Sequence, residues 1–221
     1  MDLVDIRRAI AAERRELADL LDTLTAEQWD APSLCAGWRV REVAAHMSMG
    51  FRYPLPAVLW ELTKARGGLH RMTDRLARKD AATASTGELA AFLRDHADHP
   101  WKPPVGGIET ALGHDVIHGL DITVALGIDR RVPEERLRVL LGTVSPKSLK
   151  FFGADLDGVR LRADDLDWSY GTGDELTGAP RTFSWSPTAA GSRRAVSTVS
   201  RGPVSSSPDP ARTCRFALGV A

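Results

Sequence analysis

Hydrophobic positions recur at helical spacing over most of the first 150 residues. Residues 2 to about 23 place apolar side chains on one helix face and charged ones on the other. The same period predicts helices over about 40–53, 57–65, 85–96, 107–126 and 133–144. The polar, Ala-rich residues 69–84 are expected to be a helix followed by a mobile connection. Several helices with short links indicate a helical bundle. Thr25 with Gln28, and Ser85 with Glu88, have the spacing of capping boxes that open helices.

The period changes past Gly153. Val159, Leu161 and Ala163 alternate with charged residues, and a second alternating run ends at Gly171. This predicts two short antiparallel strands that turn near 164–165. We therefore expect a mainly α protein, with a helical bundle over 1–150 and a small β appendage over 151–179.

The last 42 residues, from Pro180, differ in composition from the rest. They hold eight Ser, five Pro and three Gly, and six Arg against one Asp give them a net charge of +5. No amphipathic period runs through them, so residues 180–221 are predicted to be a disordered or loosely packed tail. A frame change that replaced an original C-terminal element is a second hypothesis for this break.

Charge and cysteine content narrow the possible functions. The 221 residues carry 29 basic and 29 acidic side chains, so no basic excess indicates a nucleic-acid partner. No apolar run approaches the roughly 18 residues of a membrane span, and the N-terminus lacks a signal-peptide pattern. We expect a cytoplasmic monomer or homodimer. Cys35 and Cys214 form neither a disulfide framework nor a metal knuckle.

The strongest chemical signal is the pair His114 and His118 in the apolar helix predicted over 107–126. Residues four apart on a helix differ by about 40° around the axis and roughly 6 Å along it, so both imidazoles can reach one cation. His46, in a second helical segment, is the candidate third ligand. Asp115 or Asp121 could accept the other ring N–H. The alternative is that two polar positions merely share a face.

Other polar residues carry weaker signals. Glu42, one turn before His46, is either a proton shuttle or a solvated helix residue. Cys35 is either a reactive thiol near a helix start or, more simply, a small residue packed under Trp38. His96 and His99 fit a polar loop, and His70 is expected to face solvent.

Three segments resemble the mycothiol-dependent maleylpyruvate isomerase family, a DinB-like group. They are Pro32 to Val40 (PSLCAGWRV), Val43 to His46 (VAAH), and Gly113 to Asp121 (GHDVIHGLD). Asp165 to Ser169 is similar to the small C-terminal β element of some members. The likeness covers residues 1 to about 179 and does not extend into the tail.

The resemblance implies a DinB-like four-helix bundle that binds a divalent metal, usually zinc, through His46, His114 and His118. Many members have Glu where this chain has His114, and the change raises the net charge of the site from about +1 to about +2. The implied cofactor is mycothiol or a similar thiol, which the metal would deprotonate. Glu42 and Asp121 are the candidate catalytic residues beside the metal.

The implied reaction is thiol-dependent isomerisation or S-transfer on a small electrophile. A non-catalytic bundle used as a ligand-binding or interaction module is the alternative, and a metal hydrolase that needs no thiol is a third possibility. The substrate, the thiol-binding residues, the metal's identity and the oligomeric state stay open at this point.

Overall fold

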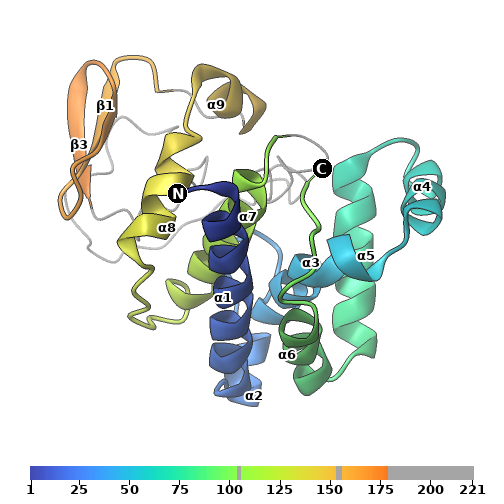
Figure 1. Cartoon of the computed structure of the whole chain (residues 1–221). Helices are drawn as coiled ribbons and strands as arrows, with labels where there is room; N and C mark the ends of the chain where they lie inside the picture. The colour runs from blue at the N-terminus through green and yellow to red at the C-terminus, as the bar shows by residue number, and fades with distance from the viewer. Residues whose placement is uncertain (104–105, 153–155, 179–221) are drawn as a thin grey trace, which may run out of the picture.

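The computed structural model describes residues 1–103, 106–152 and 156–178, and this part of the chain is mainly helical with one small sheet (Figure 1). The mainly α class with a C-terminal β element is therefore confirmed. The predicted tail over 180–221, with Cys214, lies outside the described residues. The elements are α1 (Leu3–Asp22), α2 (Ala26–Asp30), α3 (Val40–Arg52), α4 (Leu55–Lys64), α5 (Leu69–Thr83), α6 (Thr86–Asp95), α7 (Glu109–Thr123), α8 (Glu134–Gly142), α9 (Pro146–Phe152), β1 (Val159–Ala163), β2 (Ser169–Gly171) and β3 (Asp174–Gly178).

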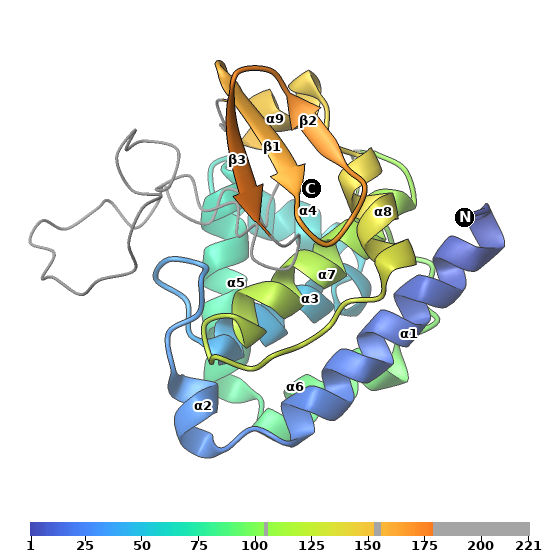
Figure 2. The same cartoon turned by 90° about the vertical axis from the view of Figure 1, so that its left-hand side faces the viewer.

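Four helices form the central bundle. Helix α1 packs against α6 and α7, and α3 packs against the same two helices, so the four close into a ring. Helix α5 adds to α3 on one side, and α8 adds to α7 on the other. Figures 1 and 2 show α4 and α5 on one flank of the bundle, and α8, α9 and the sheet on the opposite flank.

The helix starts follow the sequence signals. Thr25 with Gln28, and Ser85 with Glu88, form the predicted capping boxes at α2 and α6. The apolar face of α1 is buried through Ile10, Leu17 and Leu21. Helix α7 is shorter than the predicted 107–126, because its flanking residues form turns.

The sheet has one strand more than predicted. Strands β1 and β2 pair antiparallel as expected, and β3 pairs parallel with β1 on its other side, giving the order β2-β1-β3. Leu166 and Trp168, predicted in the second strand, precede β2. Helix α9 was also not predicted. None of the helices in the described ranges is long and apolar enough to cross a membrane.

Two clusters of ion pairs, each with buried members, join α1 to its neighbours. In the first, Glu13 is fully buried and accepts hydrogen bonds from Arg130 at 2.8 Å and Arg136 at 2.7 Å. Arg136 also binds both carboxylate oxygens of Glu16, at 2.6 and 2.7 Å. This bidentate contact holds the pKa of Glu16 below its usual value. The second cluster contains Arg14 and belongs to the site described below.

The Glu16 contact should stabilise the fold in a pH-dependent way. A carboxyl whose pKa is lowered by folding contributes stability above its unfolded pKa of about 4.5 and loses it as the pH falls through the folded pKa. We expect Glu16→Gln to lower the melting temperature at pH 7. The deficit relative to the unchanged protein should shrink toward pH 3. A deficit that stays constant with pH in thermal melts would contradict this.

Helices α1 and α7 approach closely where α7 carries Gly119. A Cβ at this position would lie 2.7 Å from Cδ2 of the fully buried Leu17 and 2.8 Å from a guanidinium nitrogen of Arg130. We expect Gly119→Ala to destabilise the protein by about 1–3 kcal/mol in denaturant titrations, because overpacking forces neighbours out of place. Gly87→Ala in α6, where a Cβ would meet no atom within 4 Å, is the matched control and should be neutral or slightly stabilising.

Candidate metal centre

The three histidines singled out in the sequence come together between two helices of the bundle. His46 extends from α3, and His114 and His118 extend from adjacent turns of α7. Their ring centroids lie 5.1, 5.0 and 4.8 Å apart. All three rings are buried, and each offers a nitrogen within 4.8 Å of the others. The helical i, i+4 spacing thus brings both α7 imidazoles to one point opposite α3.

Two carboxylates determine which ring nitrogens carry protons. His114 Nδ1 lies 2.9 Å from Asp115 Oδ1, and His118 Nδ1 lies 3.0 Å from Asp121 Oδ2. An ionised carboxylate can only accept, so each Nδ1 donates its hydrogen. The Nε2 lone pairs of His114 and His118 are therefore left available. This is the arrangement that carboxylate–histidine–metal sites use.

The residues fit a divalent cation. Nε2 of His118 is buried and has no hydrogen-bond partner among the described residues. Nε2 of His114 lies 3.3 Å from Nε2 of His46, a contact that needs either a proton on His46 or a cation bound by both. Zinc–nitrogen bonds of 2.0–2.1 Å at tetrahedral angles separate two ligand nitrogens by about 3.3 Å. Three neutral imidazoles are a donor set suited to zinc and similar ions.

The Asp115 carboxylate that accepts from His114 also belongs to a buried ion pair. Arg14 Nε of α1 donates to Asp115 Oδ2 at 2.8 Å, and both side chains are fully buried. A second guanidinium nitrogen of Arg14 donates to the carbonyls of residues 96, 97 and 99. Arg14 therefore ties α1 to α7 and to the link that precedes α7.

The ion pair also sets the charge states around His114. Burial alone would raise the pKa of Asp115, but the Arg14 guanidinium and His114 outweigh it and hold this pKa below its usual value. Burial lowers the pKa of His114, against the opposing effect of Asp115. Asp115 is thus ionised and His114 neutral near pH 7, as a metal-ligating imidazole must be.

The loop before α3 packs against His118 and Asp121. Its Leu34 N–H donates to the carbonyl of Asp121 at 3.0 Å. Cys35 Sγ lies 3.2 Å from Asp121 Oδ2 and 3.8 Å from His118 Nδ1. Cys35 is buried, which agrees with the alternative of a small packed residue. Its neighbours, however, include the polar groups of the centre.

Two tryptophans flank the histidines. The Trp38 ring lies 5.2 Å from that of His46, and the Trp101 ring lies 5.4 Å from that of His114. Trp101 occupies the space above Gly50 of α3, where a Cβ would overlap the indole. The two indoles thus pack against two of the three imidazoles.

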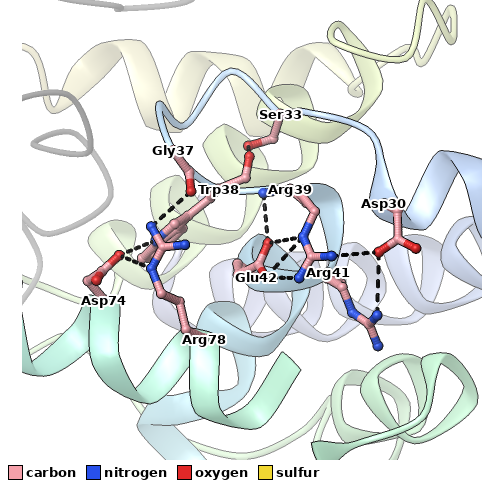
Figure 3. A network of polar contacts seen from close by, with 9 residues as sticks. All are labelled: Asp30, Ser33, Gly37, Trp38, Arg39, Arg41, Glu42, Asp74 and Arg78. Atoms are coloured by element: carbon pink, nitrogen blue, oxygen red, sulfur yellow. Dashed lines mark hydrogen bonds and ion pairs between the residues drawn. The ribbon is translucent and has the colours of Figure 1, made fainter. Parts of the chain in front are cut away.

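Glu42 is not directed to the imidazoles. It is buried, which excludes the solvated alternative, and its carboxylate is hydrogen-bonded by the backbone and guanidinium of Arg39 (Figure 3). Arg39 also contacts Asp30, and on the other side of the loop Trp38 Nε1 donates to Asp74 Oδ1 at 2.8 Å. Glu42 thus fixes the first turn of α3, and the proton-shuttle role draws no support from its contacts.

The remaining histidines lie away from this cluster. His70 is exposed on α5, as expected. His96 Nδ1 is 3.0 Å from the carbonyl of Phe92, and His99 Nδ1 accepts the N–H of Trp101 at 3.1 Å. Neither belongs to a candidate metal group among the described residues.

A cavity of about 870 Å³ adjoins the centre. His114, Ile117 and His118 of α7 line it, together with residues of α8 and α9 that include Arg138 and Lys147. Its volume is in the range of small-molecule sites. A ligand of moderate size can therefore reach the two α7 imidazoles.

Fold and site together define a helical bundle with a buried three-histidine centre beside a ligand-sized cavity. Residues 10–100 match the family model described as the mycothiol maleylpyruvate isomerase N-terminal domain. The family resemblance seen in the sequence is thereby confirmed for this part of the chain. The match includes His46 and Cys35 and ends before α7. Comparison with curated proteins and with solved structures gives no match.

Sequence reasoning missed Arg14 and underrated Cys35. Arg14 appears in the sequence as one of several charges on an amphipathic helix, and its partner Asp115 is 101 residues away. The signal available for Cys35 was its place in the loop motif, but only the fold brings that loop to Asp121.

Removal of His118 tests the centre directly. We expect His118→Ala, purified without chelators, to lose the roughly one equivalent of metal that a three-ligand site retains, because its buried Nε2 is one of the three donors. The exposed His70→Ala is the control and should keep the metal content of the unchanged protein. Metal analysis with circular dichroism as a check on folding decides this, and equal metal content in the two variants would refute the assignment.

Proposed function

We propose that this protein is a metal-dependent enzyme that uses a low-molecular-weight thiol, such as mycothiol. The thiol serves either to isomerise a small electrophile or to be transferred to it. Zinc is the proposed metal. The observation that carries the proposal is the buried convergence of three imidazoles beside a cavity that two of them line. The family description adds the thiol and the isomerase class.

The residues around the centre have two different roles. His46, His114 and His118 would hold the metal, which when bound supplies a Lewis acid that lowers the pKa of a coordinating thiol. Asp115 and Asp121 hold the protons on the two Nδ1 atoms and so keep the donor nitrogens directed at one point.

The surroundings make this point suitable for thiolate chemistry. Trp38 and Trp101 pack against the rings and limit access of water from their sides. The cavity along α7, α8 and α9 leaves the thiol and the electrophile a common approach to His114 and His118. Holding both reactants in one cavity raises their effective concentration.

A second candidate function is a non-catalytic metal-binding module. One observation favours it: the family match ends at residue 100, whereas two of the three proposed ligands lie on α7. The family description therefore applies to a segment that holds only one of the three proposed metal ligands.

The decisive experiment measures turnover with the metal-loaded full chain. We expect consumption of maleylpyruvate, the substrate in the family description, to require both zinc and mycothiol. His114→Ala should abolish it, and His70→Ala should leave it unchanged. Stoichiometric zinc without turnover of this or other small electrophiles would favour the binding module, and equal turnover in thiol-free buffer would indicate a hydrolase.

A further inference from the structure

A second group of side chains that could ligate a metal lies on the other side of the His118 ring from the three-histidine centre. It consists of Cys35, His118 and Asp121. The two groups share His118 and use its two opposite nitrogens. Nε2 faces the histidines, whereas Nδ1 faces Asp121 and Cys35.

The polar atoms of this second group satisfy one another. Asp121 Oδ2 accepts from His118 Nδ1 at 3.0 Å and from the Cys35 thiol at 3.2 Å. In contrast, the three-histidine group leaves the buried Nε2 of His118 without a partner in the described residues. The cation therefore belongs on the Nε2 side, and the Cys35 side is a support for the ligand.

The backbone fixes Cys35 in this position. Its N–H donates to the Ser33 hydroxyl at 3.1 Å, and its carbonyl accepts the Trp38 N–H at 2.9 Å. Leu34 next to it binds the Asp121 carbonyl, so the loop and the C-terminal turn of α7 are joined through backbone as well as side chain. Arg78 of α5 holds the loop from outside through the carbonyl of Gly37 (Figure 3).

Asp121 needs this support more than Asp115 does. Asp115 is fully buried and held by the Arg14 guanidinium. The Asp121 side chain is 14 % exposed. Its Oδ2 accepts a hydrogen bond from the Cys35 thiol in addition to the one from His118 Nδ1. A rotation of Asp121 toward solvent would release His118 Nδ1 and allow its ring to turn away from His46 and His114.

We propose that Cys35 is a positioning residue for the metal centre: its thiol donates to Asp121 and so locks the orientation of the ligand His118. The inference rests on the proposed function only for the presence of a metal and is independent of the thiol reaction. It assigns to Cys35 neither coordination nor a covalent step.

The test compares two substitutions of Cys35 that differ in whether the side chain can donate a hydrogen bond. Cys35→Ala removes the donor, whereas Cys35→Ser keeps an O–H donor of similar size. We expect zinc affinity, measured by competition with a chromophoric chelator, to fall about 10-fold in Cys35→Ala and to stay within about twofold of the original in Cys35→Ser. Asp121→Ala should lose about 10–100-fold. Leu89→Val, which trims a fully buried apolar side chain of α6, controls for lost stability and should keep its affinity.

A spectrum of the unchanged protein provides a readout that no folding defect can affect. Cobalt(II) bound in thiol-free buffer should show ligand-field bands of a nitrogen site and no sulfur-to-cobalt charge-transfer band. Such a band would make Cys35 a ligand and overturn the positioning role. Equal affinities of Cys35→Ala and the original, or a Cys35→Ser variant as weak as Cys35→Ala, would overturn it as well. If the unchanged protein binds no metal at all, the proposed function and the positioning role of Cys35 both fail, whereas the outcomes above overturn the positioning role alone.

Discussion

The buried ion pair between Arg14 and Asp115 is the interaction on which the centre depends. Two charges taken out of water are tolerated when they are paired and hydrogen-bonded. Here the pair joins α1 to α7, holds the link before α7 by its carbonyls, and leaves one carboxylate oxygen for His114. The loss of either partner would leave an uncompensated buried charge one contact away from the proposed metal. The same contact therefore supports both the bundle and its chemistry.

Local signals predicted most of the helical fold. The sequence pattern located α1 and α3 to α8, and capping-box residues three positions apart marked two helix starts. Strand β3 was not predicted because Asp174–Gly178 lacks alternation, and its parallel pairing with β1 skips the intervening strand β2. Helix α9 is too short for its period to be recognised. The tail predicted over 180–221 is untested.

The site was predictable to the extent that it follows helix geometry. The spacing of His114 and His118 indicated their convergence, and Asp115 or Asp121 was expected to accept the other ring N–H. The supporting contacts depend on tertiary structure. Arg14 reaches Asp115 across the bundle, and Cys35 reaches Asp121 because the loop before α3 lies on α7. Glu42, one turn from His46, has the right spacing for the centre, but Arg39 holds its carboxylate elsewhere.

The segment that matches the family model ends before the last helix of the four-helix bundle begins. It contains Arg14, Cys35 and His46, whereas Asp115, His118 and Asp121 lie beyond its end. A fragment that ends at residue 100 would expose the surfaces of α1 and α3 that α7 covers. It would also leave the Arg14 guanidinium without the Asp115 carboxylate. A boundary drawn from sequence likeness therefore falls inside the four-helix bundle of α1, α3, α6 and α7, and any smaller expression fragment of this protein should extend through α7.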